Sequence, residues 1–92
     1  MIIEIPGLLR DLTGGKAEAT AAGKNIRELL IDMDRQFPGM KSRFFNDSEQ
    51  LSNMVNIFIN EVDFHQLSGL NTSLSEGDRV RISIAPLISG GA

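Results

Sequence analysis

Residues 25–37 read NIRELLIDMDRQF, and this stretch predicts one amphipathic helix. Its apolar residues recur at the three- and four-residue spacing of a single helix face, while charged residues fill the other side. The apolar set is Ile26, Leu29, Leu30, Met33 and Phe37. Asn25 can cap the first turn. Pro38 and Gly39 end the helix, because the residue before a proline is pushed out of the helical region and glycine accepts the chain reversal.

Two strands are expected before this helix. Residues 1–5 form a β-branched run that stops at Pro6 and Gly7, since proline has no N–H to donate to a sheet ladder. After the turn signal TGG at residues 13–15, residues 16–22 alternate small apolar side chains with polar ones. The second strand is therefore expected to pair with the first as a hairpin.

Three short strands are expected after the helix. Residues 54–60 and residues 79–85 alternate apolar and polar side chains with a period of two, which indicates strands with one buried face. Between them, residues 62–64 are expected to form a short edge strand after a tight turn. A short second helix is expected at residues 40–45.

This order of elements predicts an α+β fold of the β-grasp, or ubiquitin-like, type. A mixed sheet of four to five strands would hold the first and last strands parallel in its middle, with the one main helix across one face. A generic α+β sandwich with another strand order is the alternative. The domain is expected to span residues 1–86, followed by a tail at 87–92. The expected shared core is Ile26, Leu29, Leu30, Met33, Val55, Ile57, Val80 and Ile82.

Composition narrows the possible functions. The chain has 92 residues, a net charge of −3 and no Cys, which excludes disulfides, thiolate-held metals and a cysteine nucleophile. Its basic residues are spread along the chain, so nucleic acid is not an expected partner. No long apolar stretch indicates a membrane span or a signal peptide, and a cytoplasmic location is expected. His65, the one histidine, is expected to be an ordinary surface residue, and no metal site is expected.

Three side chains are candidates for a partner-binding face. Arg79 and Arg81 share one side of the last strand, and Phe58 points away from the core if Val55 and Ile57 point inward. Solvation explains the arginines adequately, yet the same placement suits docking of an acidic partner. An aromatic side chain on a bare sheet face can anchor an interface.

The end of the chain is unusual. Beyond Pro86 the chain continues for a few residues to Gly90 and Gly91, forming a thin arm that can extend by about 3.3 Å per residue. Such an arm can enter a narrow channel in which a Cβ would clash. The reactive group would be the main-chain carboxylate, activated by a partner, because the domain offers no catalytic set of its own. The chain is therefore expected not to be an enzyme.

These stretches together resemble the MoaD/ThiS sulfur-carrier family. The similarity rests on IPGLLR at residues 5–10, TGG at 13–15, VNIFIN at 55–60, EGDRV at 76–80, and the Ala-Pro…Gly-Gly ending at residues 85–91. The match covers almost the whole chain. It is most similar to the branch of molybdopterin-synthase-small-subunit-like carriers that serve amino-acid biosynthesis.

The resemblance implies a mechanism centred on Gly91, with Gly90 as its companion. An E1-like enzyme would use ATP to adenylate the terminal carboxylate, and sulfide would then replace the adenylate to give a thiocarboxylate. The carrier itself would bind no cofactor. A sulfur-accepting synthase would take the sulfur to cysteine or homocysteine. The alternatives are a molybdopterin synthase small subunit, a ubiquitin-like protein modifier, and an inert β-grasp interaction module.

Ala92 departs from the family pattern, in which the active form ends at the second glycine. The carboxylate of Ala92 would lie one residue beyond the position of the reactive carboxylate in the family. Its methyl group would also have to fit into a channel that is wide enough only for glycine. The resemblance implies one route to the active form, which is removal of Ala92 by a JAMM-type zinc metalloprotease. A cloning residue, or a carrier that has lost activation, is the alternative.

Overall fold

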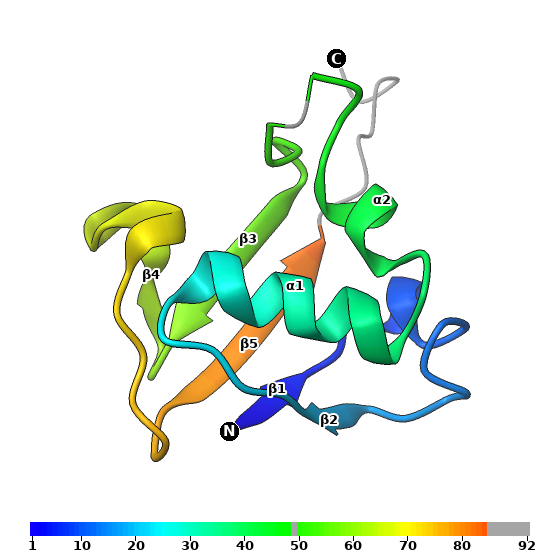
Figure 1. Cartoon of the computed structure of the whole chain (residues 1–92), viewed down its shortest axis with the longest axis horizontal. Coiled ribbons are helices and arrows are strands. Elements are labelled where there is room, and N and C mark those ends of the chain that lie inside the picture. Colours follow the sequence, from blue (N-terminus) through cyan, green and yellow to red (C-terminus); the bar gives the residue numbers. More distant parts are fainter. Residues whose placement is uncertain (49, 85–92) are drawn as a thin grey trace.

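The computed structural model, which describes residues 1–48 and 50–84, contains a five-stranded sheet in the order β2-β1-β5-β3-β4 (Figure 1). The strands are β1 (Ile2–Glu4), β2 (Glu18–Thr20), β3 (Val55–Ile59), β4 (Val62–Asp63) and β5 (Arg79–Ile84). β1 and β5 pair in parallel in the middle, and all other pairs are antiparallel. The predicted β-grasp arrangement is confirmed. The predicted strand end at Pro86 and the tail lie outside the described residues.

The predicted main helix is α1 (Ile26–Gln36), and a short α2 (Met40–Phe44) follows it. The Asn25 side chain accepts a hydrogen bond from the backbone N–H of Glu28 at 2.9 Å, and the Glu28 carboxylate accepts from the N–H of Lys24 at 3.1 Å. These two bonds satisfy N–H groups at the start of the helix. The described residues also contain three short 3₁₀ turns: η1 (Gly7–Leu9), η2 (Phe64–Gln66) and η3 (Gly69–Asn71).

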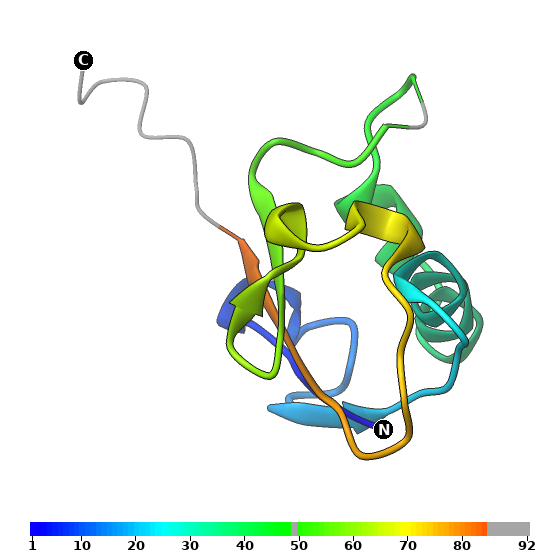
Figure 2. The same ribbon diagram turned by 90° about the vertical axis from the view of Figure 1, so that its left-hand side faces the viewer.

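All eight residues of the predicted core are buried, and α1 lies across one face of the sheet (Figure 2). The core also takes in side chains that periodicity alone did not assign to it. Phe44 from α2 and Leu9 from η1 are almost fully buried, and Leu70 and Leu74 pack against the cluster from the 67–78 loop. The other face of the sheet carries the alternate, mostly polar side chains.

The turn between β3 and β4 is held by one asparagine. Asn60 and Glu61 both have left-handed backbone angles, with φ of 51° and 69°, as a two-residue hairpin turn of this hand requires. The Asn60 side chain donates to Asp78 at 2.9 Å and accepts from the backbone N–H of Arg79 at 3.0 Å. The β3–β4 hairpin is thereby tied to the start of β5.

Gly23 lets the β2–α1 connection pass close to the helix. A Cβ at this position would lie 2.5 Å from the backbone nitrogen of Leu29 and 2.9 Å from the carbonyl carbon of Glu28. Because backbone atoms cannot swing aside as a side chain would, we expect Gly23→Ala to lower the free energy of unfolding by about 1–3 kcal/mol. Gly77→Ala is the matched control, since nothing lies within 4 Å of its added Cβ. Urea unfolding of both variants tests this; equal stabilities would contradict it.

Within residues 1–48 and 50–84, no helix has the length and apolar character needed to cross a bilayer.

Candidate functional site

The base of the predicted tail is the end of β5. The last two residues of this central strand, Ser83 and Ile84, pair with Asn56 and Val55 of β3. The chain that carries Gly90, Gly91 and Ala92 continues from here in sequence, although those three residues lie outside the described part of the structure. A rigid central strand therefore fixes the point at which the last eight residues begin.

Phe58 and Arg81 come together on the face of the sheet opposite α1, which we call the open face. They are cross-strand partners on β3 and β5, and the Arg81 guanidinium carbon lies 4.2 Å from the centroid of the Phe58 ring. This is a cation–π contact, which is favourable by about 0.5–1 kcal/mol when partly exposed. The two predicted residues thus form one half-buried unit in the middle of the open face.

Arg79 lies on the same face but away from the tail base. It is separated from Ile84 by five residues of extended strand, a distance of about 16 Å. Its guanidinium lies 3.7 Å from the Glu4 carboxylate and 3.4 Å from that of Glu18. Arg79 therefore joins β5 to β1 and β2, at the opposite end of β5 from the point where the tail begins.

The open face is acidic overall. Arg81 lies 3.3 Å from Glu61, so both arginines already have carboxylate partners within the chain. The carboxylates on or beside this face are Glu4, Glu18, Glu61 and Asp63. These four carboxylates were not among the predicted site residues. The alternation of Glu4 with buried Ile3, and of Glu18 with buried Ala19, was the signal that could have placed them there.

Asp63 lies on the edge strand β4, opposite Phe58 of β3. Its carboxylate accepts hydrogen bonds from the backbone N–H of His65 at 2.8 Å and from the Asn56 side chain at 3.1 Å. These bonds favour the charged form and lower the pKa of Asp63 below its ordinary value. The His65 ring nitrogen Nδ1 lies 2.8 Å from the same carboxylate, with its side chain exposed as predicted. This pair is a local surface contact on the η2 turn.

Three aspartates make the fold sensitive to acid. Backbone N–H groups of Ala22, His65 and Ser75 respectively lower the pKa of Asp32, Asp63 and Asp78. Since each folded-state pKa lies below the unfolded value, this stabilisation is complete above about pH 4 and is lost as the pH falls through the folded-state pKa values. The triple Asp→Asn variant should therefore lose less stability between pH 7 and pH 3 than the parent. Urea unfolding at the two pH values measures this; parallel losses would contradict it.

Residues 1–48 and 50–84 contain no group of three acidic or histidine side chains placed to hold a metal ion. What the described residues offer is a small β-grasp domain, a central strand that leads to the chain end, and a polar face around Phe58 and Arg81.

The chain belongs to the ThiS family, whose model matches residues 3–91. It is 32% identical over 91 residues to the sulfur carrier protein CysO of Mycobacterium tuberculosis, covering 97% of this chain and 96% of CysO. Its fold matches the crystal structure of that protein with a TM-score of 0.86 at 31% identity, covering 92% and 98% of the two chains.

Two further solved structures are similar. CysO in the BexX/CysO complex of Amycolatopsis orientalis matches with a TM-score of 0.86 at 29% identity, covering 94% of this chain and 96% of that one. The small archaeal modifier protein 1 of Methanosarcina acetivorans matches with a TM-score of 0.80 at 26% identity, covering 98% and 94%. The resemblance to the family found in the sequence is thereby confirmed.

Proposed function

We propose that this protein is a sulfur carrier whose Gly91 carboxylate is adenylated by an E1-like enzyme and converted to a thiocarboxylate. The observation that supports this most strongly is similarity to the sulfur carrier CysO over 97% of the chain, together with Gly90 and Gly91 at the end of the matched region. The carrier acts as a co-substrate. ATP is bound and used by the activating enzyme, and the carrier holds no cofactor.

The chemistry follows from what the chain has and lacks. Adenylation joins the carboxylate to AMP as a mixed anhydride and releases pyrophosphate. Sulfide then attacks the acyl carbon and AMP leaves, so the thiocarboxylate formed is a sulfur nucleophile on a protein handle. With no Cys in the sequence, the carrier cannot trap its own sulfur as an internal disulfide. The sulfur then passes to a synthase that makes cysteine or homocysteine.

The active form ends at Gly91, so Ala92 is removed first. We propose a JAMM-type zinc metalloprotease for this cleavage. Such a route would keep the newly made chain inactive until it is processed, because its terminal carboxylate is then one residue too far out for the activating site.

Intact-mass measurement of the protein isolated from its native host tests the proposal. The expected result is loss of the mass of one alanine residue and, in part of the sample, replacement of one oxygen by one sulfur. Cells grown with little sulfur nutrient are the sample of choice. If they contained only the full-length protein, that result would count against both the removal of Ala92 and the formation of the thiocarboxylate.

A ubiquitin-like modifier is the second candidate, favoured by the 26% identity to the small archaeal modifier protein 1. In that case Gly91 would form an isopeptide bond with lysines of other proteins. Conjugates of high mass on a denaturing gel, absent when Gly91 is deleted, would distinguish this function. A molybdopterin synthase small subunit would instead co-purify with a large catalytic subunit.

The open face is the surface that we propose the activating enzyme reads. Replacing Arg79 and Arg81 by Gln should raise the KM for the carrier in an adenylation assay several-fold, with kcat little changed and a weaker dependence on salt. Reversal to Glu is unsuitable, because it would place new carboxylates beside Glu4, Glu18 and Glu61.

A matched control removes two of the three ion pairs from the carboxylate side and leaves the pair between Arg79 and Glu4. Glu18→Gln with Glu61→Gln breaks contacts of both arginines but leaves the arginines in place. The control should bind at least as well as the parent. If both double variants bound the activating enzyme equally weakly, the ion pairs within the carrier would determine binding, and not the arginines themselves. If neither variant bound more weakly than the parent, the arginines would be ordinary solvated surface residues.

A further inference from the structure

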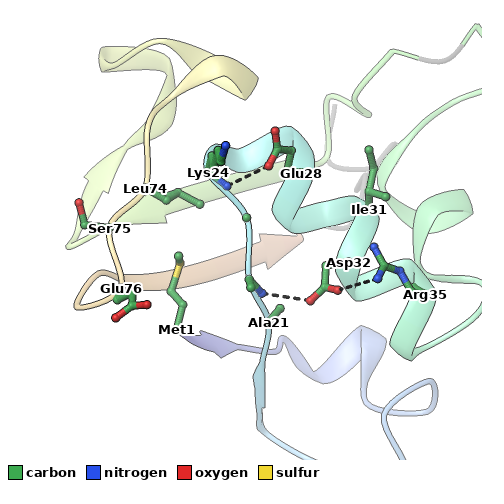
Figure 3. A pocket seen from close by; sticks show the side chains of 12 residues that line it. Met1, Ala21, Lys24, Glu28, Ile31, Asp32, Arg35, Leu74, Ser75 and Glu76 are labelled. Carbon is green, nitrogen blue, oxygen red and sulfur yellow. Dashed lines mark hydrogen bonds and ion pairs between the residues drawn. The ribbon is translucent and has the colours of Figure 1, made fainter.

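Two hollows meet at one exposed apolar side chain on the outer side of α1. Ile31 is 53% exposed, and Figure 3 shows it on α1 at the edge of the larger hollow, an open groove of about 860 Å³ that extends past Asp32 to Met1. On its other side, Ile31 borders a second hollow of about 210 Å³ between α1 and α2. This second hollow, which we call the α1–α2 hollow, is lined by Arg27, Leu30, Ile31, Lys41 and Phe45.

The α1–α2 hollow combines an apolar floor with two cations. Arg27 and Lys41 stand beside the apolar side chains, and among the described residues neither makes an ion pair within 4.0 Å. The nearby carboxylate of Asp34 is engaged by the backbone N–H of Lys41 at 2.8 Å. Arg27 and Lys41 are thus the charged side chains in the lining of this hollow, whereas Asp34 and Asp47 line the adjoining hollow together with Lys41.

The size of the α1–α2 hollow selects the kind of occupant. Sites for small metabolites commonly have volumes of about 300–1,000 Å³, and this one is smaller. It suits a single aliphatic or aromatic side chain presented by another protein. The two cations then require that carboxylates stand next to that side chain, since complementary charge steers association and selects the partner.

We propose that the α1–α2 hollow is a docking site for an acidic protein segment that inserts one apolar side chain over Ile31 and pairs its carboxylates with Arg27 and Lys41. The helices α1 and α2 that form this site lie on one side of the sheet (Figure 2). Phe58 and Arg81 belong to the open face on the other side. A partner bound there leaves the open face accessible. The carrier can therefore be held by one protein while another reaches its chain end.

A defined probe tests the site. The probe is a synthetic amphipathic peptide of Glu and Leu at helical spacing, titrated into isotope-labelled protein while amide chemical shifts are recorded. Shift changes should centre on Arg27, Ile31, Lys41 and Phe45. A peptide with Lys in place of Glu, and one with Ser in place of Leu, should not bind. Changes centred on the open face, or no binding of the Glu–Leu peptide, would overturn the proposal.

Substitutions in the hollow provide a second test of the docking site. Arg27→Glu with Lys41→Glu should weaken binding of the Glu–Leu peptide about tenfold, since each exposed charge pair contributes roughly a factor of 1.5 to 5. Ile31→Gln should also weaken it, and Gln keeps the helix intact. Arg10→Glu with Lys16→Glu is the control, because it makes the same change in net charge at exposed positions outside the hollow. If this control bound the Glu–Leu peptide as weakly as the Arg27 and Lys41 variant, the loss of affinity would follow from net charge alone. That result would overturn the proposed docking site.

The peptide titration needs no activating enzyme, so its outcome is separate from that of the proposed sulfur chemistry. The Arg27 and Lys41 variant should still be adenylated at the parent rate once Ala92 is absent. A loss of adenylation in that variant would show that the α1–α2 hollow is part of the activating enzyme's footprint, which would contradict its assignment as an independent site.

Discussion

A chain shortened to end at Gly91 should be adenylated by the cognate E1-like enzyme, and the full-length chain ending at Ala92 should be a poor substrate. One extra residue displaces the terminal carboxylate by about 3.3–3.6 Å when the chain is extended. A positional error of 1 Å at a reacting centre can cost about a hundredfold in rate. The expected difference between the two forms is therefore at least about a hundredfold in pyrophosphate release.

A Gly91→Val version of the shortened chain is the control for the shape of the channel. It keeps the carboxylate at the same position along the chain but adds a branched side chain, so it should fail where Gly91 succeeds. A zinc metalloprotease that cuts after Gly91 should convert the full-length form into the active one. Equal adenylation of the two lengths, or of neither with an enzyme known to be active, would defeat the precursor hypothesis and favour an interaction module without tail chemistry.

The largest effect on stability is expected for Leu30→Ala. Leu30 is 2% exposed and lies between α1 and the sheet, so removing its methyl groups should lower the free energy of unfolding by about 2–5 kcal/mol. For a domain of this size the loss corresponds to a fall in Tm of at least about 8 °C. Ile31→Ala, one residue along the helix at a position that is 53% exposed, should change stability by less than about 0.5 kcal/mol.

Chemical denaturation of these two neighbours tests the rotational phase of the helix directly. If both variants lost similar free energy, Leu30 and Ile31 would share the burial that the structure assigns to Leu30 alone. Because the two substitutions remove side chains of the same composition from adjacent positions, differences in helix propensity are small against the expected gap.

The sequence was sufficient to predict elements whose signal is local. The spacing of Leu29, Leu30 and Met33 determined the buried face of α1, and strict alternation determined which side of β3 and β5 meets it. The parallel pairing of β1 with β5 followed from the order of elements, because few connections of this order bury both hydrophobic strands.

Contacts between residues far apart in sequence were not accessible in the same way. The sequence around Arg79 does not indicate that its partner is Glu18, which lies sixty-one residues away in the chain. The need for glycine at position 23 is likewise seen only in the structure, where the backbone passes so close to Leu29 that a Cβ would clash. The proposed site differs again, because Gly91 was assigned from its place in a sequence pattern, and the described residues supply only the strand that precedes it in sequence.

The placement of β5 also has a mechanical consequence. It is flanked by β1 on one side and β3 on the other, and it is the strand from which the chain end continues. A force applied along the axis of β5 would load the hydrogen bonds to both neighbouring strands in shear at the same time. Forced unfolding depends on the rate of unfolding under load, so the domain should resist a partner that pulls on its end. In the proposed reaction, an activating enzyme could therefore hold the chain end under tension while the domain stays folded.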